Sequence, residues 1–89
     1  MRVRNMTSKR GNSVLNQYII YMENEVYFQS YNNMIAKKSY EGDAVELQDG
    51  YWDNYSATIN KYLNRFLGTS GIAEIREKVK NGEFEIGDI

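Results

Sequence analysis

The stretch "SATINKYLNRFLG" at residues 56–68 decides the fold, because its apolar side chains recur at helical spacing. Counted from the first of them, the positions fall at i, i+3, i+4, i+7 and i+8, which form one wide stripe on a helix. Ser56 is suited to accept a backbone N–H at the helix start, and Gly68 can adopt the left-handed conformation that ends a helix. The sequence therefore predicts an amphipathic helix over residues 57–67, whose stripe consists of Ile59, Tyr62, Leu63, Phe66 and Leu67.

Before this helix, the chain alternates with the period of β-strands. In "LNQYIIYM" (15–22) both faces carry apolar or aromatic groups, which is typical of a central strand. One face would hold Tyr18, Ile20 and Met22, and the other Leu15, Ile19 and Tyr21. The same pattern, with turn-prone residues between the segments, predicts further strands over 25–31, 34–40 and 44–48.

After the helix, "IAEIREKVK" predicts a second helix over residues 72–80 that ends at Asn81-Gly82. The tail at 83–89 would form a last edge strand or lie extended over the core. The N-terminal residues 1–13 form a basic arm that could also be an edge strand. With 89 residues the chain is expected to form one domain. We predict an α+β fold in which an antiparallel meander of three to four strands precedes two helices packed on one face, with a short C-terminal strand as an option.

Catalytic and metal chemistry find little support in the composition. The chain has no cysteine and no histidine, which excludes disulfides and thiolate metal sites and removes the commonest general base. Catalysis would then need a carboxylate pair, a lysine nucleophile or a tyrosine acid, and no such group is convincingly placed. Glu41, Asp43 and Asp49 lie beside glycines in ordinary turn composition. We therefore expect no enzyme, no cofactor and no metal site.

Charge and hydropathy suggest a soluble cytoplasmic protein without a membrane span. The formal net charge is −1, with basic residues over 1–22 and mostly acidic ones over 23–55. No run approaches the ~18 apolar residues that cross a bilayer. The basic N-terminus also lacks the apolar segment of a signal peptide.

Three segments carry a resemblance to a known group of proteins. These are "NQYII" (16–20), "VYFQSYNNMIAK" (26–37) and "DNYSATINKYLNRFLG" (53–68). Over residues 14–68 the chain resembles a family of small uncharacterised proteins encoded by bacteriophages and mobile elements of Gram-positive bacteria. The resemblance implies an accessory viral protein in the host cytoplasm. It transfers no activity, because the family has no established function.

The aromatic content favours a binding function. Eight tyrosines in 89 residues exceed what so small a core can hide, and tyrosine and tryptophan often anchor interfaces. The spacing of Tyr55 and Ile59 favours packing of the Tyr55 ring against the helix, whereas Trp52 could be either a core residue or a contact. An acidic, tyrosine-bearing sheet edge could occupy the basic nucleic-acid groove of a host defence nuclease, as an anti-CRISPR inhibitor would. The predicted partner contacts are Glu23, Glu25, Tyr27, Tyr31, Glu46, Asp49 and Trp52.

Two alternatives remain open from sequence. A nucleic-acid-binding accessory protein would stack bases on sheet tyrosines and hold phosphates with Arg2, Arg4, Lys9 and Arg10. Against it stands a pI near 5.4, which is low for a nucleic-acid-binding domain. A homodimeric structural or regulatory phage protein would instead pair through an open sheet edge.

Overall fold

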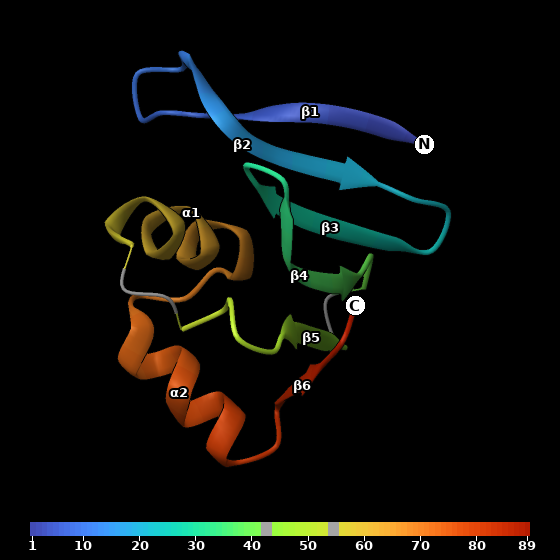
Figure 1. The fold of residues 1–89 in the computed structure, drawn as a ribbon, viewed down its shortest axis with the longest axis vertical. Helices are drawn as coiled ribbons and strands as arrows, with labels where there is room; N and C mark the ends of the chain where they lie inside the picture. The colour runs from blue at the N-terminus through green and yellow to red at the C-terminus, as the bar shows by residue number, and fades with distance from the viewer. Residues whose placement is uncertain (42–43, 54–55) are drawn as a thin grey trace.

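The computed structural model describes residues 1–41, 44–53 and 56–89. It is an α+β fold in which one six-stranded sheet is combined with two helices (Figure 1). The strands are β1 (Arg2–Thr7), β2 (Ser13–Tyr21), β3 (Glu25–Ser30), β4 (Asn33–Ser39), β5 (Val45–Gln48) and β6 (Phe84–Gly87), and the helices are α1 (Ala57–Leu67) and α2 (Ile72–Lys80). The predictions for Asp43 and Tyr55 lie outside the described residues.

The sheet follows the chain order β1-β2-β3-β4-β5-β6. Neighbouring strands from β1 to β5 pair antiparallel, as predicted for a meander. The predicted number of strands, three to four, was nevertheless too low, because the sheet also contains β1 and β6. The sheet is also mixed rather than purely antiparallel. Strand β6 pairs parallel with β5, since the chain returns to that edge only after passing through both helices.

The N-terminal arm is the edge strand that the sequence left as an option. Arg2 pairs with Tyr21 and Asn5 with Tyr18, and the register then shifts before Thr7 pairs with Ser13. Asn16 lies in this irregular part of β2 with φ 65°. The shift reverses the alternation, so Leu15 is 82% exposed. Placing Leu15 on the same face as Ile19 was therefore wrong.

Helix α1 begins and ends at the predicted residues. The Ser56 hydroxyl accepts the backbone N–H of Ile59 at 3.4 Å, and Gly68 ends the helix with φ 73°. Three of the predicted stripe residues, Tyr62, Leu63 and Phe66, are buried. A side-chain cap and a glycine stop at matching ends explain why the sequence located this helix so well.

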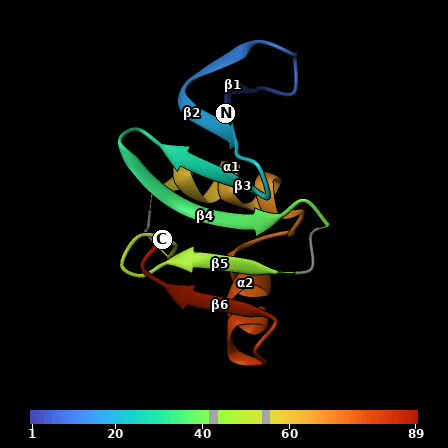
Figure 2. The ribbon, with the colours of Figure 1, turned by 90° about the vertical axis from the view of Figure 1, so that its right-hand side faces the viewer.

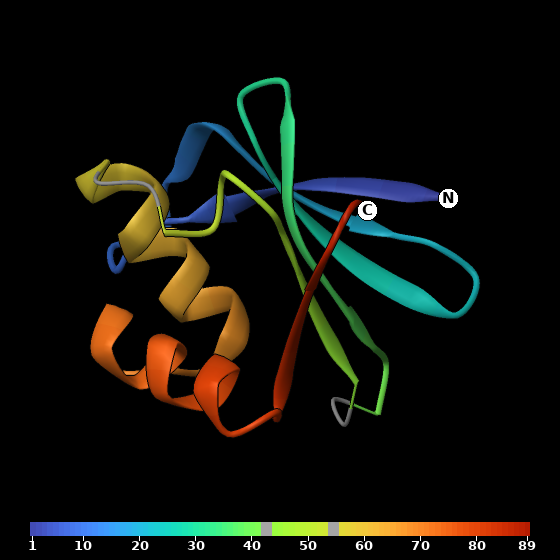
Figure 3. The same cartoon turned by 60° about the horizontal axis from the view of Figure 1, so that its bottom comes forward.

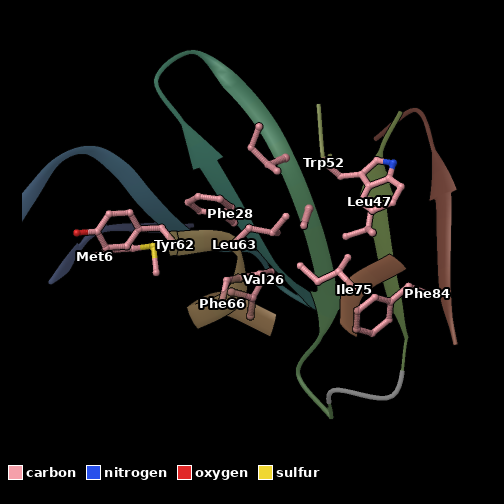
Figure 4. Packing of buried hydrophobic residues seen from close by; sticks show 12 residues of the cluster. Met6, Val26, Phe28, Leu47, Trp52, Tyr62, Leu63, Phe66, Ile75 and Phe84 are labelled. Atoms are coloured by element: carbon pink, nitrogen blue, oxygen red, sulfur yellow. The ribbon is translucent and has the colours of Figure 1, made fainter. Parts of the chain in front are cut away.

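Both helices lie on one side of the sheet (Figure 3). The core fills the space between the sheet and the two helices. The Phe28 and Phe66 rings stack with centroids 5.9 Å apart, joining β3 to α1. Figure 4 shows the cluster, whose members are Met6, Val26, Phe28, Ile35, Ala36, Leu47, Trp52, Tyr62, Leu63, Phe66, Ile75 and Phe84. Trp52 is 9% exposed within it. Its prediction as a partner contact was therefore wrong, because its ring lies with the core residues of the sheet and helices.

Candidate functional site

The second face of the sheet carries no described helix, and neither terminal segment folds across it. Figure 2 looks at this side and shows the strands in front of both helices. The two terminal segments instead lengthen the sheet at its edges, as β1 and β6. We call this surface the open face. Cross-strand pairing places one row of residues along it, namely Val3, Ile20, Tyr27, Lys37, Glu46 and Glu85.

One half of the open face is charged. The Lys37 ammonium lies 3.3 Å from a Glu25 carboxylate oxygen and 3.5 Å from one of Glu46. Desolvation alone would lower the pKa of Lys37, but the hydrogen bond and charge of Glu25, with smaller effects from Tyr27 and Glu46, raise it above its usual range. Glu85 pairs with Glu46 on the neighbouring strand. Two carboxylates therefore share one ammonium, and Glu85 adds a third carboxylate beside them, so this half keeps a negative surplus.

The other half of the open face is apolar and aromatic. Val3, Tyr18, Ile20, Gln29 and Tyr31 contribute to the walls of a shallow hollow of about 310 Å³. Val3 and Tyr31 are 53% and 54% exposed. Ile20 is buried by its strand neighbours rather than by the main core. An exposed apolar patch beside polar groups is a common feature of interaction sites.

Tyr31 is held in an unusual backbone conformation at the edge of this hollow. It begins the two-residue turn between β3 and β4, with φ 55°. Its N–H donates to the Asn16 carbonyl at 2.7 Å, and its own carbonyl accepts from the Gln29 amide at 2.6 Å. A left-handed residue with a Cβ costs about 1–2 kcal/mol. These two hydrogen bonds fix the backbone of the turn from which the Tyr31 ring projects.

The structure brings only part of the predicted partner set together. Glu25, Tyr27 and Glu46 lie side by side on the open face, where the Tyr27 hydroxyl donates to Glu25 at 3.3 Å. Tyr31 lies at the opposite end of β3, beside the apolar hollow. Glu23 and Asp49 are exposed in the turns that follow β2 and β5. Trp52 belongs to the core.

The predicted basic set lies elsewhere. The Arg2 guanidinium is 4.5 Å from the centroid of the Tyr21 ring, and that of Arg4 is 6.0 Å from it. Tyr21 pairs with the core residue Val26, so this ring belongs to the helix side of the sheet. Lys9 and Arg10 are exposed in the turn after β1. Tyr18 and Tyr27 thus lie on the opposite face from Arg2 and Arg4, which is not the arrangement expected of a base-stacking platform.

Sequence reasoning missed several residues of the open face. Val3 was missed because β1 was expected only as an optional edge strand, and its residues were not assigned to the two faces of the sheet. Tyr18 and Ile20 were assigned to a common face, yet nothing in the sequence indicated that this face would stay open. Lys37 and Glu85 are neighbours of Glu46 because β4, β5 and β6 pair side by side. The register of that pairing could not be predicted from the sequence.

Neither of the two described helices is long and apolar enough to cross a membrane. Within residues 1–41, 44–53 and 56–89, no group of acidic side chains is arranged to hold a metal ion. No curated protein and no solved structure matches the chain. A family model does match, over residues 1–82. The chain therefore belongs to a family of unknown function, DUF8033.

Proposed function

We propose that this chain is a non-enzymatic binding protein whose open face docks on a macromolecular partner. The observation that carries the proposal is that tyrosines and carboxylates line up on a six-stranded sheet face with no described helix over it. A sheet of this kind can leave one face to solvent, and such a face is then mostly polar. An uncovered face with half-buried rings is better suited to contact another molecule.

The tyrosines of the open face supply anchor residues. Tyr18, Tyr27 and Tyr31 offer large contact areas with little side-chain entropy to lose, and such residues often dominate interface energies. The constrained turn supports this role for Tyr31, since asparagine or glycine would adopt its conformation more easily. Strained backbone that survives in a fold is frequently found at functional sites.

The charged half favours a basic partner. Glu25, Glu46 and Glu85 outnumber Lys37 on this half of the open face, so positive potential on the partner would be attracted. A groove that binds nucleic acid has such potential. Our finer proposal is a phage or prophage accessory protein that occupies the basic groove of a host defence nuclease, as an anti-CRISPR inhibitor would.

The test combines capture with inhibition. Tagged protein is used to capture partners from a host lysate, and each partner is then assayed for nuclease activity with and without the protein. We expect the wild-type chain to inhibit, and the double variant Tyr18→Ser, Tyr27→Ser to lose capture and inhibition together. Tyr51→Ser is the matched control, because Tyr51 is an exposed tyrosine outside the hollow.

Two results would count against the proposal. Unimpaired restriction of phage or plasmid in cells that express the protein would remove the inhibitor role. A double variant that captures the partner as well as wild type does would remove the open face as the docking surface. Circular dichroism of each variant separates lost binding from lost folding.

The alternative of nucleic-acid binding through sheet tyrosines is less well supported, because Tyr18 and Tyr27 share their face with Glu25 and Glu46 rather than with the arginines. Salt-titrated binding to single-stranded DNA and RNA discriminates between the two, since phosphate contacts weaken steeply with salt. A homodimer paired through β1 or β6 is a further alternative, which sedimentation would reveal.

A further inference from the structure

A second candidate site lies on the helix side of the sheet, between β1 and α1. Its cleft has a volume of about 340 Å³, within the range of small-molecule sites, roughly 300–1,000 Å³. Ile19, Val26 and Phe66 contribute an apolar floor, and the Tyr21 ring forms part of the wall. Three cationic residues, Arg4, Lys38 and Arg65, also line it, and no described acidic residue does.

The three cationic side chains differ in how many of their N–H donors already have partners. Lys38 donates to the Phe66 carbonyl at 2.6 Å and lies 4.5 Å from the centroid of the Phe66 ring. It thereby compensates the negative end of α1. Arg65 donates to the Thr7 carbonyl and keeps further N–H donors. Arg4 makes only the long contact with Tyr21, and neither arginine has an ion pair with a described residue. Arg4 and Arg65 therefore have N–H donors that could bind a ligand.

Arg4 and Arg65 line the same cleft without an ion-pair partner among the described residues, so the cleft is expected to attract an anion. Arginine forks match phosphate oxygens in bidentate geometry. An aromatic wall and an apolar floor suit the flat base that accompanies the phosphate in a nucleotide. We propose that this cleft binds a phosphate-bearing nucleotide unit, with Arg4 and Arg65 on the phosphate and the base over the apolar floor.

The unit could come from a free mononucleotide or from the 5′-phosphate end of a nucleic-acid strand. Both present the same chemistry to the cleft. The site is separate from the open face, which lies on the other side of the sheet, so the inference does not rest on the proposed function. Variants at Tyr18 and Tyr27 should leave nucleotide binding unchanged.

The experiment is fluorescence polarisation with three labelled probes at ~50 mM salt, where phosphate contacts are weakly screened. The probes are adenosine monophosphate, a short thymidine oligomer with a 5′-phosphate, and the same oligomer with a 5′-hydroxyl. Binding of the mononucleotide identifies a free nucleotide as the source. Binding of only the 5′-phosphorylated oligomer identifies a strand end. Either result supports the proposal.

The variant Arg4→Gln, Arg65→Gln should weaken binding about tenfold or more, because each arginine would lose charge-assisted hydrogen bonds. Lys9→Gln, Lys61→Gln is the matched control, since it removes the same charge outside the cleft lining. If the double variant fails to fold, chemical-shift mapping of the wild-type chain replaces it. Shifts should then gather on β1 and the second half of α1.

Several outcomes would overturn the proposal. One is that none of the three probes binds. Another is equal affinity for the two oligomers together with equal losses in the arginine variant and its control, which indicates general attraction to a polyanion. A third is that the chemical-shift changes caused by the probe are centred on the open face. Binding of an acidic peptide without binding of any nucleotide probe would assign the cleft to a different ligand class.

Discussion

The backbone N–H of Tyr31 donates to the carbonyl of Asn16 at 2.7 Å, and both residues are in the left-handed region, with φ 55° and 65°. Two residues that carry Cβ atoms are therefore strained and joined to each other. Asn16 is of a type that tolerates this conformation, whereas a tyrosine seldom adopts it. The pair links the irregular part of β2 to the β3–β4 turn, beside the hollow on the open face.

Replacing Tyr31 by asparagine should stabilise the fold. Asparagine adopts the left-handed conformation at lower cost, so we expect the free energy of unfolding to rise by ~0.5–1 kcal/mol. Urea denaturation measures the change. Tyr51→Asn is the control, because Tyr51 is an exposed tyrosine without positive φ. A stability loss in Tyr31→Asn that exceeds the loss in the control would show that the ring stabilises the turn more than its backbone strain costs.

Gln17 should be replaceable by methionine with a gain in stability. Its side chain is fully buried, and neither its amide nitrogen nor its oxygen has a hydrogen-bond partner among the described residues. An unpaired buried polar group costs about 1–3 kcal/mol, so Gln17→Met should stabilise by roughly 1–2 kcal/mol. Chemical denaturation provides the measurement.

Gln29→Met serves as the contrasting variant for this prediction. The Gln29 amide donates to the Tyr31 carbonyl, so its loss should destabilise the fold. Equal effects of the two variants would mean that the Gln17 amide is satisfied in solution, for example by water.

Much of the fold could be predicted because its signals are local. The helix over residues 57–67 combines an apolar stripe with a serine cap and a glycine stop, and each of these depends only on neighbouring residues. The pairing of β6 depends instead on where the chain lies after it has passed through two helices. Neither the partner strand of β6 nor its direction could therefore be predicted. Leu15 was misplaced because the left-handed Asn16 breaks a period that sequence reasoning takes as continuous.

The candidate site was less predictable than the fold. The position of Tyr27 on the open face and the burial of Trp52 depend on which sheet face the helices cover. The alternation of the strands does not determine that face. Lys37 and its two acidic partners, Glu25 and Glu46, come from three separate strands. Their proximity follows from register, which the turns determine over long stretches of chain.

Lys37→Gln should destabilise the fold at neutral pH. The variant leaves Glu25 and Glu46 without their shared cation, and partly exposed ion pairs contribute up to about 1 kcal/mol. Because the folded pKa of Lys37 is raised, its contribution is fully present below the unfolded pKa, ordinarily 10.5, and is lost as pH rises through the folded pKa. Denaturation of both proteins at neutral pH and above 10.5 measures this. A difference that stays constant across that range would contradict the prediction.

Lys38 should show the opposite pH dependence, although it is adjacent in sequence. Its side chain lies on the helix side beside Phe66, and burial lowers its pKa below 10.5. The unfolded chain then binds more protons than the folded chain between the lowered pKa and 10.5, so the Lys38 contribution to stability rises with pH in that window. Lys38→Met should remove this rise, and it also removes the hydrogen bond to the end of α1. Comparing unfolding free energies of wild type, Lys38→Met and Lys37→Gln from neutral pH to about 10.5 separates the two lysines. If Lys38→Met keeps the pH slope of wild type over this range, the ammonium is solvated and the cleft beside it is more open to water than its lining residues suggest.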